Sequence, residues 1–192
     1  MYIMSSPKTN LVRLVQDSTS RKDFSYNKKV ENQYASSLIS VSKQIEKMLK
    51  KYDPNSPVSS LDILQSLREY SEELTEWAKN IAFKLIYNLN EDDKRQWLRQ
   101  TEMVSQGMRQ EIENAPVYGK LQRYMLENVD LIKSMPLKAA QRVQEIIVEN
   151  IKSGELRAED LAEKIMSVGN ATRGRAQLIA RTETARISTG LA

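Results

Sequence analysis

Residues 61–89 read LDILQSLREYSEELTEWAKNIAFKLIYNL and carry the longest regular apolar pattern of the chain. Apolar side chains recur there every three or four positions, which places them on one face of an α-helix. The stripe consists of Leu64, Leu67, Leu74, Trp77, Ile81, Leu85 and Leu89. Ser59 and Asp62 fit the pattern of a capping pair just before it. The sequence therefore predicts a long helix that begins near residue 59, and we expect it to be the central helix of the fold.

The segment before this helix predicts another amphipathic helix over residues 26–52. Its apolar face consists of Tyr34, Leu38, Val41, Ile45, Met48 and Tyr52. Two prolines within 53–57 end it, because proline cannot continue a helix. With fewer than four clean heptads, this face favours packing inside a bundle over a coiled-coil seam. Residues 1–25 lack a steady period and are predicted to form an N-terminal arm.

The chain after residue 89 predicts several shorter helices. Asn90–Asp93 resembles a helix start, because carboxylates are favourable at the positive end of the helix dipole. Pro136 is expected to end a helix, because the residue before proline is disfavoured in the helical conformation. The last helix is expected to begin at Asn170 or Thr172. The predicted helix boundaries in this part are Asn90–Asp93, Pro116, Pro136, Gly154 and Gly169.

The fold class that follows is all-α, because no segment alternates with period two for long enough to require a sheet. We expect a bundle of about six to seven helices with short loops. The predicted organisation is an arm at 1–25, a helical region at 26–115 and a second helical region at 116–192.

The composition argues against catalysis. The 192 residues include no cysteine and no histidine, which removes thiolate chemistry, the commonest general base and the commonest metal ligand. Neighbouring carboxylates such as Asp92 and Asp93 fall at predicted helix starts, where capping explains them. We therefore expect no catalytic residue, no cofactor and no metal site. The absence of a long apolar run and of a secretory signal predicts no membrane span and synthesis in the cytoplasm.

The charge is divided along the chain. Lys and Arg against Asp and Glu number 10 and 5 for residues 1–53, 7 and 11 for 54–115, and 12 and 9 for 116–192. Basic ends permit nucleic-acid contact, but mixed charges are also typical of a solvated surface. Both interpretations stay open at this point.

Two short segments in the last third carry the most specific signal. Residues 127–136 read ENVDLIKSMP, and residues 178–186 read LIARTETAR. In this order and at this spacing they resemble two blocks of the phage head-morphogenesis family, the Mu F-like minor head proteins. The resemblance implies a structural motif made of Leu178, Ile179, Arg181, Thr182, Glu183 and Thr184.

The resemblance also implies a function. Members of this family are minor structural proteins of the phage head that associate with the portal vertex during head morphogenesis, and some affect DNA delivery. The expected partners are a portal protein, a major capsid protein or both, with phage DNA as a further partner. The expected location is the virion or procapsid, reached from the host cytoplasm. Members continue beyond the second block, so we expect the family region to be C-terminally incomplete at Ala192. The alternative is a helical nucleic-acid-binding module that uses the basic terminal segments.

The candidate binding residues are Arg173, Arg175 and Arg186. If the last helix begins near Thr172, the first two arginines lie in its first turn, where cations are disfavoured. An anion is then expected to compensate, either the acidic stretch 155–163 or an external phosphate or acidic portal surface. At about 100° per residue, Arg175 and Arg186 lie nearly in line.

Other side chains of the last helix have separate expected roles. Arg181 and Glu183 are each expected to pair within the molecule and hold the helix in place. Ile179, Ile187 and Leu191 are expected to be partly exposed, because family members have further residues after this helix. Such a patch would favour self-association.

Overall fold

The fold is all-α, as predicted, and the computed structural model describes residues 27–56, 58–100 and 118–191. Within these ranges the chain forms four helices and no strand. They are α1 (Lys28–Leu49), α2 (Ser59–Gln100), α4 (Tyr118–Ser153) and α5 (Ala158–Leu191). The predicted number of helices, six to seven, is larger than the four found in the described residues. The predicted arm at 1–25 lies outside the described residues, and the proposed boundary between residues 115 and 116 stays a prediction.

Three predicted helix boundaries are wrong, because the helices run straight through them. α2 continues across Asn90–Asp93, α4 across Pro136 and α5 across Gly169. In α4 and α5 the apolar face keeps its phase on both sides of the proline or glycine signal. In α5, for example, Ile165, Val168, Thr172, Ala176 and Ile179 are all buried. Burial of a continuous face outweighs a local signal that costs about 1–3 kcal/mol in a helix interior.

A bond from a neighbouring helix lies beside Pro136 of α4. Proline has no N–H, so the carbonyl of Ile132, four residues earlier, loses its intrahelical donor. The buried Ser71 hydroxyl of α2 donates a hydrogen bond to the next carbonyl oxygen, that of Lys133, at 2.9 Å. This bond ties the turn before the proline to α2.

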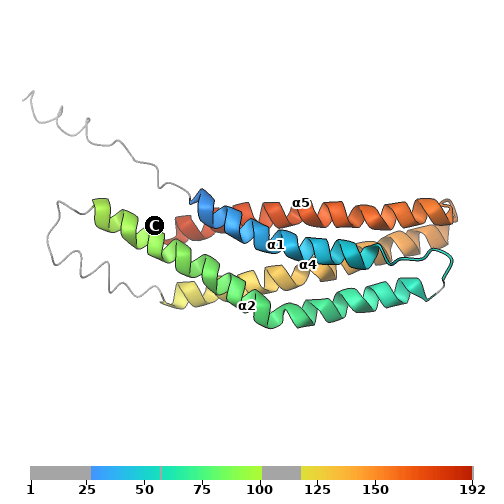
Figure 1. Ribbon diagram of the computed structural model, residues 1–192, viewed down its shortest axis with the longest axis horizontal. Helices are drawn as coiled ribbons and strands as arrows, with labels where there is room; N and C mark the ends of the chain where they lie inside the picture. The colour runs from blue at the N-terminus through green and yellow to red at the C-terminus, as the bar shows by residue number, and fades with distance from the viewer. Residues whose placement is uncertain (1–26, 57, 101–117, 192) are drawn as a thin grey trace, which may run out of the picture.

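The helices form an antiparallel bundle in which the first and last helices are neighbours (Figure 1). α1 packs most extensively against α5, and α2 packs most extensively against α4. α1 and α5 run along one side, whereas α2 runs along the other. α2 is the longest described helix, as expected, but it lies at the side of the bundle and is not central. Side chains from all four helices join one buried cluster, with Leu38, Leu67, Ile132 and Ile187 among its least exposed members.

The helix ends are fixed by short-range polar contacts. The Asn27 side chain accepts hydrogen bonds from the N–H groups of Lys29 and Val30 and caps α1. The Ser59 hydroxyl accepts from the Asp53 N–H at 2.8 Å, in place of the capping pair expected with Asp62. Gly154, with φ +64°, follows the end of α4 as predicted, because this left-handed conformation favours glycine.

The predicted exposed patch on the last helix is wrong for two of its three residues. Ile179 and Ile187 are buried in the core, whereas Leu191 packs against it and is partly exposed, as predicted. The covering elements are α1 and α4, which both contact α5. The residues that this part of α5 exposes instead include Leu178.

Candidate functional site

A buried polar cluster joins α1, α4 and α5. The Tyr34 hydroxyl of α1 donates to Asn128 Oδ1 of α4 at 2.9 Å. The Asn128 amide nitrogen donates to Glu183 Oε2 of α5 at 3.2 Å and to the Tyr124 carbonyl at 2.9 Å. Asn128 is completely buried, and Tyr34 and Glu183 are almost so. Buried polar groups are stable only when paired, and here each one finds its partner on another helix or one turn away.

Arg186 closes this cluster on its outer side. Its Nε and Nη2 donate to Glu183 Oε2 at 3.1 and 2.6 Å. Its Nη2 also lies 2.7 Å from Glu127 Oε2, as an ion pair without the angles of a hydrogen bond. The guanidinium lies over the Tyr124 ring, 5.0 Å from its centroid, within the range of a cation–π contact. One arginine of α5 therefore binds three groups of α4 and α5.

The end of α5 fits closely around Tyr124. A methyl group added at Gly190 would overlap the Tyr124 hydroxyl. Glycine therefore allows the ring to lie against the α5 backbone. Lys120 Nζ donates to the Gly190 carbonyl at 3.5 Å, a long bond to one of the unpaired carbonyls of the last helical turn.

The electrostatics of this cluster favour one charge state at neutral pH. Burial raises the pKa of the Tyr34 phenol well above its ordinary value, and the nearby charge of Glu183 raises it further. The hydrogen bond from Arg186 to Glu183 raises the pKa of the guanidinium, and Glu127 adds to this effect. A neutral tyrosine and a charged arginine thus enclose one carboxylate. Such an arrangement fixes the register of α1, α4 and α5 relative to one another, because its contacts join all three helices.

The predicted binding arginines are not brought together. Arg186 is engaged in the buried cluster, whereas Arg173 is exposed more than three turns earlier on α5. Arg175 is half-buried, and its Nε is buried without a hydrogen-bond partner among the described residues. Because α5 begins at Ala158, neither Arg173 nor Arg175 lies in a first helical turn. The dipole argument that motivated their selection is therefore wrong, although their binding role stays a prediction.

Residues of the LIARTETAR segment divide between the core and the surface. Ile179, Glu183 and Thr184 are buried, and the Thr184 hydroxyl donates to the Ala180 carbonyl at 2.7 Å. Leu178, Arg181 and Thr182 are exposed. The expected intramolecular pairing is confirmed for Glu183, which pairs with Arg186, whereas Arg181 forms no ion pair with another described residue. One side of α5 therefore packs in the core at this segment, and the other side faces solvent.

Arg173 interacts electrostatically with a carboxylate of α1 and not with the acidic stretch 155–163. That stretch lies in and just before the first turns of the same continuous helix, so it cannot fold back. Glu46 of α1 has a lowered pKa, chiefly through its bond to Lys50, with a smaller contribution from Arg173. A Cβ at Gly169 would lie 3.1 Å from Glu46 Cγ, so α1 and α5 approach closely here. The sequence signal for this approach was the glycine inside an apolar helical pattern.

Asn128 and Tyr34 are the site residues that the sequence analysis did not select. Asn128 interrupts an apolar helix face, and a buried amide needs partners. A polar residue on an apolar face was therefore the sequence feature that could have indicated this cluster. Tyr34 had been assigned to the apolar face of its helix, where its ring does lie.

Comparison with protein-family models, curated proteins and solved structures found no match. The described residues contain no cluster of acidic side chains able to hold a metal ion. In the same part of the chain, no helix has the length and apolar character needed to cross a membrane.

Proposed function

We propose that this protein is a minor head protein of a tailed phage, a helical structural component that associates with the portal vertex during head assembly. Its proposed partners are a portal protein, a major capsid protein or both. Its proposed location is the procapsid or virion, after assembly in the host cytoplasm. The proposed role is not catalytic.

The observation that carries this proposal is the contact between the two segments that resemble the family blocks. Glu127 and Asn128 come from the ENVDLIKSMP segment, and Glu183 and Arg186 come from the LIARTETAR segment. Asn128 donates to Glu183, and Arg186 pairs with Glu127. Segments about forty residues apart in sequence thus build one buried cluster, which supports treating the resemblance as a single unit.

The exposed half of the second segment is the proposed contact surface for the partner. Leu178 is 59% exposed, and Arg181 and Thr182 lie on the same outward part of α5. An apolar side chain flanked by polar ones is typical of protein contact sites. The buried half positions this surface by fixing α5 against α1 and α4.

Co-expression with a portal protein and a major capsid protein of the same phage tests the proposal. The tagged chain should retain at least one of them on an affinity column. Leu178→Glu should reduce this retention at least tenfold without changing the melting temperature. Ile151→Glu is the matched control, because Ile151 is 77% exposed on a different helix, and this variant should behave as wild type. Retention of neither partner by the wild-type chain would contradict the proposal.

A nucleic-acid-binding module is the second candidate function. Among the described residues, the exposed cations Arg173 and Arg181 have no ion-pair partner. Binding through such groups weakens steeply with salt, because counterions are released from the phosphates. Arg173→Ala combined with Arg181→Ala should then lower DNA affinity and the salt dependence together. Unchanged DNA affinity in this variant would reject the second function for this surface.

A further inference from the structure

The α1–α5 groove is a shallow depression between the first and last helices, with a volume of about 560 Å³. Small side chains of α1, among them Ala35, Ser36 and Ser40, line it together with Lys43 of α1 and Arg181 of α5. Small residues allow another helix to approach closely. On α5, a Cβ at Gly174 would meet nothing within 4 Å, so this side of the helix is also open.

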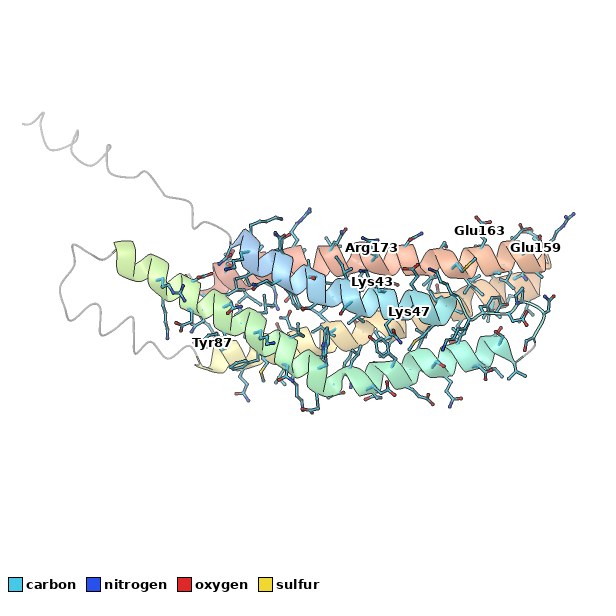
Figure 2. The ribbon with its side chains drawn as sticks, in the orientation of Figure 1. Lys43, Lys47, Tyr87, Glu159, Glu163 and Arg173 are labelled. Atoms are coloured by element: carbon cyan, nitrogen blue, oxygen red, sulfur yellow. The ribbon has the colours of Figure 1, made fainter. Side chains whose placement is uncertain are left out.

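Exposed cations lie in and beside this groove. Lys43, Lys47, Arg173 and Arg181 are exposed, and none forms an ion pair with another described residue. Figure 2 shows Lys43 and Lys47 of α1 beside Arg173 of α5, on the same side of the bundle. Two carboxylates lie among them. Glu31 lines the groove but is buried and pairs with Lys28 at 2.8 Å, and Glu46 pairs with Lys50 at 2.7 Å and also interacts with Lys43 and Arg173. The exposed cations outnumber these carboxylates, so the groove keeps a net positive charge.

The complementary charge lies on α2, on the other side of the same molecule. Glu69, Glu72, Glu73 and Glu76 are all exposed and lie within about 100° around the helix axis, so they form one surface, the α2 acidic face. Glu72 and Glu76 have ion-pair partners on their own chain, Lys133 and Lys79, yet their side chains are 75% and 79% exposed. Such exposed pairs are weak and exchange readily.

The two surfaces match in length as well as in charge. At 1.5 Å per residue, Arg173 and Arg181 are about 12 Å apart along α5, and Glu69 and Glu76 are about 10 Å apart along α2. Exposed apolar side chains flank the acidic face, with Leu61 before it and Phe83 after it. Apolar contact can supply affinity, while the charges select the partner and its orientation.

From this match we propose that the chain associates with a second copy of itself, with the α2 acidic face of one molecule in the α1–α5 groove of the next. A nucleic acid fits less well, because only four cations are spread over two helices, whereas duplex DNA carries one charge per about 1.7 Å. The chain's own residues 1–26 do not complement the groove either, since they contain four cations and two carboxylates.

The positions of the two surfaces determine the symmetry of this association. α1 and α5 run along one side of the bundle, and α2 runs along the opposite side (Figure 1). A two-fold dimer would need both surfaces to meet their counterparts at one interface. With the surfaces on opposite sides, the contact is head-to-tail, so it forms either a ring or an open chain of molecules.

Sedimentation velocity of the full chain at increasing protein concentration tests this proposal. Association should grow with concentration at about 0.1 M salt and decrease strongly at about 1 M salt, where charges are screened beyond about 3 Å. The groove variant, Lys43→Glu with Arg181→Glu, should stay monomeric. The face variant, Glu69→Lys with Glu76→Lys, should stay monomeric as well. Circular dichroism of each variant should show the wild-type helix content.

Mixing the two variants gives the decisive measurement. Each variant keeps one native surface, and the two altered surfaces are again opposite in charge. Association should therefore return in the mixture, although each variant alone is monomeric. Glu155→Lys with Glu163→Lys adds the same charge as the face variant, but at exposed positions just before α5 and near its start, and should associate as wild type.

Three results would overturn the proposal. The first is a wild-type chain that remains monomeric at protein concentrations up to about 1 mM, at which even a complex with a dissociation constant of about 1 mM would form. The second is a mixture of the two variants that stays monomeric. The third is a monomeric chain that binds duplex DNA and loses this binding in the groove variant, which would assign the groove to nucleic acid.

Discussion

Replacing Asn128 by alanine tests the buried polar cluster directly. The change removes the acceptor of the Tyr34 hydroxyl and leaves that hydroxyl buried without a partner. An unsatisfied buried donor costs about 1–3 kcal/mol, and the lost bond to Glu183 adds about 1 kcal/mol. We therefore expect Asn128→Ala to lower the free energy of unfolding by about 2–4 kcal/mol. Glu183 keeps its bonds from Arg186, which limits the loss.

A double-mutant cycle with Tyr34→Phe separates this bond from general packing. Tyr34→Phe alone should cost about 1–2 kcal/mol, because it leaves Asn128 Oδ1 without its donor. In the double variant neither unsatisfied group remains. The combined loss should then be smaller than the sum of the single losses by about 1 kcal/mol or more, within the range measured for contacting residues.

Urea denaturation is followed by circular dichroism at 222 nm, where helices give a strong signal. The free energy of unfolding of each variant follows from its linear dependence on denaturant concentration. Tyr87→Phe is the control, because Tyr87 is exposed, and its loss should stay within about 0.5 kcal/mol. Additivity of Asn128→Ala and Tyr34→Phe within about 0.3 kcal/mol would refute the coupling. A loss of unfolding free energy in Asn128→Ala no larger than the loss in Tyr87→Phe would refute it as well.

Three other predictions follow from packing, helix continuity and titration. Leu74→Ala should lower the free energy of unfolding by about 2–5 kcal/mol in urea denaturation, because Leu74 is buried in the core; a loss below about half a kcal/mol would contradict this. Gly174→Ala should raise the melting temperature and stabilise by about 0.5–1 kcal/mol, because Gly174 lies inside α5 with open space around it; destabilisation would argue that α5 is interrupted. Since the folded-state pKa of Tyr34 is raised, its contribution to stability should be complete below pH of about 10 and fall as pH rises further. Alkaline titration of the unfolding free energy should give a shallower decline in Tyr34→Phe, and an identical decline would refute this.

The helical class could be predicted from the sequence, but the number of helices could not. Pro136 is a strong local signal for a helix end, yet Ile132, Met135, Ala139 and Val143 are all buried on one face. Their spacing of three and four residues continues across the proline and predicts one continuous helix. The phase of the apolar face is a stronger signal here than the proline, so the predicted helix end at Pro136 is wrong. The bond from Ser71 to the turn before the proline comes from another helix and could not be placed without the fold.

The site was predictable only in part. Arg186 and Glu183 were both selected from the LIARTETAR segment, but their partners Tyr34 and Asn128 lie on other helices. Helical geometry places Arg186 one turn after Glu183, and this i,i+3 pairing was available from the sequence. The choice between Arg181 and Arg186 depended on which face of α5 meets α4. That face is set by tertiary packing, which a single helix does not specify.

The pairing of α1 with α5 has a consequence for how the chain folds as it is made. Ribosomal synthesis delivers α1 first and α5 last, so the apolar face of α1 lacks its main covering helix until the final segment emerges. α2 and α4 are closer in sequence and can form their contact earlier, since closing a shorter loop costs less entropy. A nascent chain stalled before residue 158 would expose Leu38 and Ile45, and it is the species that a chaperone should recognise.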